Sequence, residues 1–145
     1  VNDGIITLSP SLTAPSNAKA AITLTDVLAA LKVYLGKALP TTYASPLNYI
    51  AADFDGVGGV TLTDVLSLLK YYLGKSTTAT PQWVFVDASD ISGSGSTGSV
   101  TGANGQPLSK TNTEPHPIDQ FFDADHSSIE LVGVLRGDVD GSWSG

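Results

Sequence analysis

An internal duplication constrains the fold of this chain more than any other feature. Residues 22–37 and 60–75 are identical at twelve of sixteen positions, at an offset of 38. In each copy leucines recur at spacings of four, three and four residues, which match the period of an amphipathic helix. The two stripes are Leu24, Leu28, Leu31 and Leu35 in the first copy, and Leu62, Leu66, Leu69 and Leu73 in the second. The duplication therefore predicts two similar helices whose leucine stripes are buried against each other.

Both predicted helices have recognisable ends. Thr25 and Thr63 are N-cap candidates, and each precedes an aspartate, a residue that is favourable in a first helical turn. Gly36 and Gly74 follow the last leucine of each copy, where glycine commonly ends a helix. Each helix is expected to begin near its threonine and to end before its glycine.

The segment before the second helix, residues 53–64, has most features of a calcium loop. Aspartates stand at loop positions one, three and twelve, and Gly58 at position six permits a sharp turn. Because calcium takes about six to eight oxygen ligands, we expect side chains and one backbone carbonyl to supply them. The predicted ligands are the side chains of Asp53, Asp55 and Asp64, the Gly59 carbonyl, and Thr61 directly or through water.

One ligand position of this loop is unfilled. Position five is Val57, so a side-chain oxygen is missing and the site is expected to be weaker than a complete one. The alternative is a glycine-rich turn whose aspartates only cap the following helix.

Two other segments each carry part of the same pattern. The stretch before the first helix keeps Asn17 and Asp26 at positions three and twelve but lacks the other ligands. Near the C-terminus, Asp138 and Asp140 begin a similar loop that has no helix after it. Either these two aspartates end a strand in a simple turn, with Trp143 against the core, or they complete a second calcium site with Asp26.

The remaining segments predict an α+β fold in which the duplicated helix pair packs on a small antiparallel β-sheet. Residues 45–52 have a capping serine and an early proline and predict a short connecting helix. Residues 82–87 and 128–136 are rich in β-branched and aromatic residues and predict strands that pair with each other. Residues 4–9 are a candidate third strand beside them. The expected organisation is an N-terminal strand or arm (1–14), the repeat pair (15–76), and a β region (77–145) with a flexible Gly/Ser-rich loop (88–112).

Composition excludes several functional classes. The net charge is -7 and the chain has seven lysines and arginines, so it lacks the electrostatic basis for binding nucleic acid or anionic membranes. The absence of cysteine excludes disulfides and thiolate metal sites. No apolar run approaches the roughly eighteen residues needed to cross a bilayer, so membrane insertion is not expected.

No catalytic motif is recognisable in the sequence, and an enzyme is not expected. His116 with Asp119 lacks an evident nucleophile. His116 and His126 also lie near Asp123 and Asp125, but their spacings fit no common metal-ligand motif, so solvated loop residues are expected.

The duplicated loop and helix, with Asp53, Asp55, Gly58, Val60 and Asp64, resemble the type I dockerin fold over roughly residues 15–75. Residues 51–56, 81–87 and 131–143 look like dockerin-like C-terminal regions of large secreted bacterial proteins. The resemblance implies calcium loops of the F-hand type that order the helix pair, and in cellulosomal dockerins this pair binds a cohesin. The paired Ser/Thr recognition residues of those dockerins are replaced here by Leu24-Thr25 and Leu62-Thr63.

We therefore expect a noncatalytic, calcium-stabilised assembly or docking module of a secreted or cell-surface bacterial protein. A loop that lacks one oxygen binds weakly and would be filled by extracellular rather than cytosolic calcium. The expected partner is a cohesin-like module, another part of the parent protein, or a second copy. The alternative is a structural subunit of a surface filament or adhesin, in which residues 1–10 add as a strand to a neighbouring copy.

Overall fold

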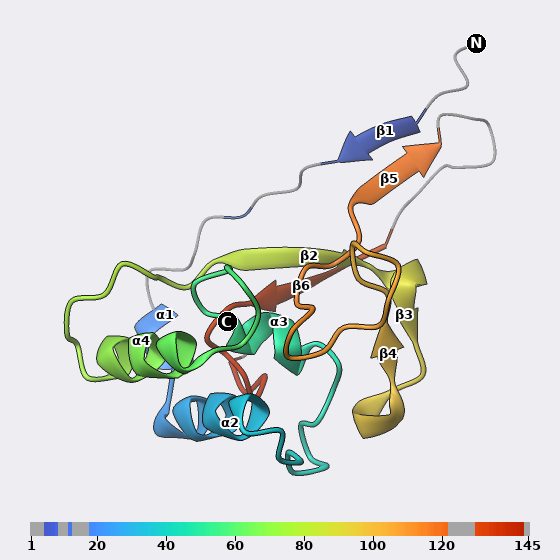
Figure 1. Ribbon diagram of the computed structural model, residues 1–145. Helices are drawn as coiled ribbons and strands as arrows, with labels where there is room; N and C mark the ends of the chain where they lie inside the picture. The colour runs from blue at the N-terminus through green and yellow to red at the C-terminus, as the bar shows by residue number, and fades with distance from the viewer. Residues whose placement is uncertain (1–4, 9–11, 13–17, 122–129, 144–145) are drawn as a thin grey trace.

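The computed structural model describes residues 5–8, 12, 18–121 and 130–143. Within these residues the fold is α+β, as predicted (Figure 1). The helices are α1 (Ala18–Ala21), α2 (Leu24–Tyr34), α3 (Asn48–Ala52) and α4 (Leu62–Tyr72). The strands are β1 (Ile5–Leu8), β2 (Trp83–Asp87), β3 (Ile91–Ser92), β4 (Ser99–Val100), β5 (Ile118–Phe121) and β6 (Leu131–Leu135). The predictions that concern His126, Asp123, Asp125 and most of residues 1–14 lie outside the described residues.

The two duplicated helices, α2 and α4, form as predicted but begin slightly earlier. Their N-caps are Thr23 and Thr61 rather than Thr25 and Thr63. The reason is a side-chain bond across the first turn, in which Asp26 or Asp64 accepts from the backbone N–H and the hydroxyl of the capping threonine. Both helices end before a glycine in the left-handed region, as predicted, with φ of 69° at Gly36 and 72° at Gly74.

The prediction that the leucine stripes are buried against each other is wrong. Leu24, Leu28, Leu35, Leu62, Leu66 and Leu73 are 46 to 57% exposed. The helices instead bury a second apolar stripe, which includes Val27, Ala30 and Val33 in α2 and Val65 and Leu68 in α4. Both stripes satisfy the helical period, and small alanines on the second stripe of α2 allow neighbouring elements to approach closely. Leu31 and Leu69 lie partly buried at the edge of the core.

Among the described residues, the strands form three separate two-stranded antiparallel sheets rather than one sheet. β2 pairs with β6, from Trp83 opposite Leu135 to Asp87 opposite Leu131, which confirms the predicted pairing of these two segments. β1 pairs with β5, which was not predicted to be a strand, and forms a ribbon apart from β2 and β6 (Figure 1). The segment predicted to be a flexible loop contains β3 and β4, because Val100 and Leu108 are buried and anchor it.

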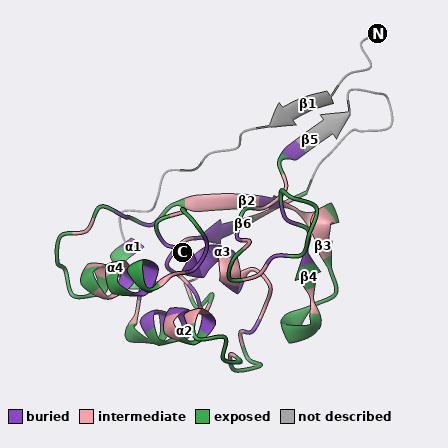
Figure 2. Cartoon of the chain, viewed as in Figure 1, coloured by how far each residue is buried: buried purple, intermediate pink, exposed green. Residues whose placement is uncertain are grey.

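The core lies between the helices and the β2–β6 sheet (Figure 2). α2 packs against α4 and α3, and α3 also contacts β6. The connecting helix predicted at 45–52 is present as α3, with Asn48 as its first residue. Among the described residues, no helix is both long and apolar enough to span a membrane.

Candidate metal centres

The predicted calcium loop brings its three aspartates together at the start of α4. Asp53 follows the last residue of α3, and Asp64 lies in the first turn of α4. A carboxylate oxygen from each of Asp53, Asp55 and Asp64 lies within 4.8 Å of the other two. Asp53 and Asp64 are buried, whereas Asp55 is exposed, so the cluster is open to solvent on one side. We call these three residues the loop cluster.

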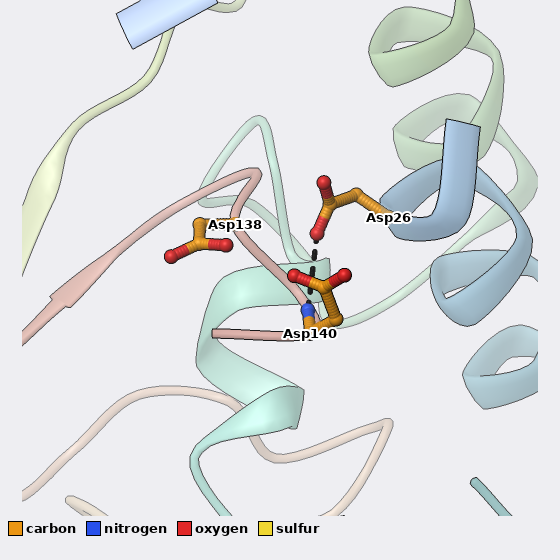
Figure 3. Close-up of side chains that lie close together, drawn as sticks. All are labelled: Asp26, Asp138 and Asp140. Carbon is orange, nitrogen blue, oxygen red and sulfur yellow. Dashed lines mark hydrogen bonds between the residues drawn. The ribbon is translucent and has the colours of Figure 1, made fainter. Parts of the chain in front are cut away.

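A second cluster unites residues from opposite ends of the sequence. Asp26 lies in the first turn of α2, while Asp138 and Asp140 follow β6 (Figure 3). Their carboxylate oxygens also lie within 4.8 Å of one another. The backbone N–H of Asp140 donates to Asp26 Oδ1 at 3.0 Å. The structure thus joins the two partial motifs into what we call the split cluster.

The two clusters share one hydrogen-bonding pattern. In the loop cluster, Asp55 N donates to Asp64 Oδ1 at 3.0 Å, which corresponds to the bond from Asp140 to Asp26. Val57 N donates to Asp53 at 3.1 Å and to Asp55 at 2.9 Å. In the split cluster Ser142 N makes the same pair of bonds, to Asp138 at 3.1 Å and to Asp140 at 2.9 Å.

Neighbouring residues of the two clusters correspond as well. Phe54 and Val139, each between the first two aspartates of its cluster, are both 1% exposed. Gly56 and Gly141 follow the second aspartate, with φ of 72° and 66°. The split cluster is therefore the same loop start as the loop cluster, docked onto the helix that belongs to the other repeat.

Burial makes both clusters costly to ionise. Desolvation raises the pKa of Asp53 from 3.8 to about 6, and the nearby Asp64 carboxylate adds to the shift. Burial likewise raises the pKa of Asp64. In the split cluster, burial raises the pKa of Asp26, and burial together with the negative charge of Asp26 raises the pKa of Asp138. In each cluster burial therefore disfavours the ionised carboxylates, and a bound cation would favour them.

The donor set suits a hard divalent cation. Each cluster offers three carboxylates from a turn and a helix start, and carboxylate oxygens are the ligands that calcium prefers. The split cluster also has the Ser142 hydroxyl at the position where the loop cluster has Val57, which is 71% exposed. The split cluster thus has an oxygen-bearing residue at the one position where the loop cluster has none.

The other predicted ligands lie in the same loop. Gly59 has φ of 81°, as its place in a tight turn requires, and it lies against the Lys110 carbonyl. The Thr61 hydroxyl donates to Asp64 at 3.1 Å, so in this structure it serves the helix cap. Coordination by the Gly59 carbonyl and Thr61 stays a prediction.

Two residues near the loop cluster were not predicted from the sequence. The Thr113 hydroxyl donates to Asp53 Oδ2. The Arg136 guanidinium lies against Gly56, and its positive charge lowers the pKa of Asp53, opposing the effect of burial. Both residues are distant from the loop in sequence, and no spacing pattern links them to it.

The chain matches no protein-family model, no curated protein and no solved structure.

Proposed function

We propose that this chain is a noncatalytic assembly module that two calcium ions stabilise, with a dockerin-like helix pair as its docking element. The observation that carries the proposal is the repeated hydrogen-bonding pattern of the loop and split clusters. A capping role needs only Asp26 and Asp64, the helix residues. A capping role does not explain why two further aspartates lie beside each helix residue. These are Asp53 and Asp55 beside Asp64, and Asp138 and Asp140 beside Asp26.

Calcium would stabilise the fold by binding the folded clusters in preference to the unfolded chain. An ion at a hundredfold excess over its dissociation constant contributes about 2.7 kcal/mol. The loop cluster would fix α3 to α4, because Asp53 ends one helix and Asp64 begins the other. The split cluster would fasten the segment after β6 to α2. The two ions together would order the surface that the helix pair presents.

That surface is apolar. Leu24, Leu28 and Leu35 on α2 and Leu62, Leu66 and Leu73 on α4 are each about half exposed. An exposed apolar surface that several large side chains share is typical of protein–protein interaction sites. Because the two helices pack against each other, these leucines lie on neighbouring elements. We propose that they contact a separate protein module with a complementary apolar face, since the helix pair binds a cohesin in the family that the repeats resemble.

Thermal melting tests the calcium part of this proposal. The protein is stripped with a chelator and then melted with calcium, with magnesium or without a divalent ion. We expect a rise in melting temperature with millimolar calcium and a smaller rise with magnesium, which demands stricter octahedral geometry. Equal melting temperatures with calcium and with chelator would overturn the proposal.

Binding to a type I cohesin module, followed by calorimetry, tests the docking part. We expect calcium-dependent binding that Leu28→Asp and Leu66→Asp abolish together, because both place a charge on the leucine surface. Loss of binding should occur without loss of the fold, as judged by circular dichroism. Binding that survives the double substitution would place the partner surface elsewhere.

A second function is favoured by the position of β1. This strand pairs with β5 in a two-stranded sheet of its own, so the same backbone bonds could form with β5 of another copy. Such an exchange would make the chain a structural subunit of a filament or adhesin. It predicts polymers by size-exclusion chromatography that disappear when residues 1–10 are removed, and monomers of the full chain would contradict it.

A further inference from the structure

Asp53 is held by a residue that lies sixty positions away in the sequence. Asp53 is 2% exposed, and its two carboxylate oxygens have different partners. Oδ1 accepts from the Val57 backbone N–H inside the loop, whereas Oδ2 accepts from the Thr113 hydroxyl. Thr113 is itself 5% exposed, so water does not readily replace it. The two bonds together fix the rotation of the Asp53 carboxylate.

The segment that carries Thr113 is fastened to the loop at a second point. The Val60 backbone N–H donates to the Lys110 carbonyl at 2.7 Å. Gly59 lies so close to this segment that a Cβ atom there would be 2.5 Å from the Lys110 carbonyl oxygen. A tight turn between Ser109 and Asn112, with backbone bonds of 2.9 and 3.1 Å, gives the segment a defined shape.

Lys110 also ties this segment to the first repeat. Its ammonium donates to the Tyr34 carbonyl at 2.9 Å and lies 5.9 Å from the centre of the Tyr34 ring. The segment 109–113 is therefore anchored to the end of α2, to the middle of the calcium loop and to Asp53. Thr113 is presented to Asp53 from a rigid support rather than from a free loop.

The split cluster has a different arrangement at the corresponding aspartate. Asp138 Oδ1 accepts from Ser142 N at 3.1 Å, and Oδ2 accepts from Trp143 N at 3.3 Å. Both donors are backbone groups within five residues of Asp138. The comparison provides an internal control, because a change at Thr113 should affect one cluster and not the other.

We propose that Thr113 is a positioning residue for the cation of the loop cluster, which rests on the proposed calcium-binding function. Its hydroxyl holds Oδ2 of Asp53 and so directs the other oxygen at the ion, in the manner of outer partners that orient metal ligands. The calcium loop of this chain is thus completed by the β region, and residues 15–76 alone do not make the whole site.

Calcium titration by calorimetry in two matched backgrounds tests the proposal. Asp140→Ala leaves the loop cluster as the intact site, and Asp55→Ala leaves the split cluster; the two aspartates occupy equivalent positions. Thr113→Val keeps the shape of the side chain and removes the hydroxyl. We expect calcium affinity to fall roughly 10- to 100-fold in the Asp140→Ala background and to stay within twofold in the Asp55→Ala background. Thr113→Ser should restore the affinity, and Thr111→Val, on the exposed side of the same turn, should leave it unchanged.

An unchanged affinity of Thr113→Val in the Asp140→Ala background would overturn the positioning role while leaving calcium binding intact. Equal weakening in both backgrounds would also overturn it, because it would indicate a general loss of stability. If Thr113→Val does not fold, Thr113→Ala takes its place with the same expected values. Absence of calcium binding before any change at Thr113 would contradict the proposed function itself.

Discussion

In the absence of divalent ions, this protein should become less stable as the pH rises from 5 to 7.5. The cause is the buried aspartate at the start of the calcium loop. Burial raises the pKa of Asp53 from 3.8 to about 6 in the folded state. Between these two pH values the Asp53 carboxyl is ionised in the unfolded chain but keeps its proton in the folded chain. Stability is therefore greatest below the lower pKa and is lost as the pH rises through the higher one.

The size of the effect follows from the size of the shift. One pKa unit corresponds to 1.36 kcal/mol, so the whole shift of Asp53 is on the order of 3 kcal/mol. About one unit of it falls between pH 5 and pH 7.5, or roughly 1 kcal/mol. The split cluster shifts in the same direction, since burial raises the pKa of both Asp26 and Asp138. Asp53 alone should lower the melting temperature by about 4 °C over this interval, and the split cluster should add to the fall.

The assay is thermal melting followed by circular dichroism, with chelator or with excess calcium, at several pH values. With chelator the melting temperature should fall from pH 5 to pH 7.5. With calcium it should rise over the same interval, because the ion binds deprotonated carboxylates. Asp53→Asn should reduce the fall seen with chelator, because it removes the titrating group. A melting temperature that is constant or rises with pH in chelator would show that the buried aspartates do not destabilise the fold as they ionise.

Three further predictions concern single side chains. Leu68→Ala should cost about 2–5 kcal/mol of unfolding free energy by urea denaturation, because Leu68 is fully buried. The matched change Leu66→Ala, at a residue that is 49% exposed, should cost less than about 1 kcal/mol, and a cost equal to that of Leu68→Ala would contradict the exposed surface. Val57→Asp should strengthen calcium binding to the loop cluster, by roughly tenfold in a calorimetric titration, because it supplies the missing oxygen ligand. It should also lower stability in chelator, and weaker calcium binding would contradict the assigned loop positions.

The duplication and its spacings predicted the two similar helices, and the β-branched and aromatic residues of 82–87 and 128–136 predicted the β2–β6 pairing and thus the α+β class. They could not predict which face of each helix is buried. Leu28 and Val27 belong to stripes that both follow the helical period, and the choice depends on which elements pack there. The sequence places leucine, the larger and more hydrophobic residue, on the exposed stripe. This inversion is recognisable only when the burial of each residue is known.

The split cluster corresponds to one of the two interpretations that the sequence left open, because its halves carry complementary parts of one pattern. Asp138 and Asp140 supply the start of a loop, and Asp26 supplies its last position. No pattern in the sequence indicated that Thr113 would contact Asp53. A hydroxyl that reaches a carboxylate across sixty residues depends on the path of the chain between them, here on a segment predicted to be flexible.

The number of calcium ions bound tests most directly whether both clusters are calcium sites. Chelator-stripped protein is titrated with calcium by calorimetry, alongside Asp55→Ala and Asp140→Ala, which change the equivalent position of each cluster. We predict two bound ions for the unaltered chain and one for each variant. One ion for the unaltered chain, with no change on Asp140→Ala, would contradict the split site. No binding at millimolar calcium would contradict both sites.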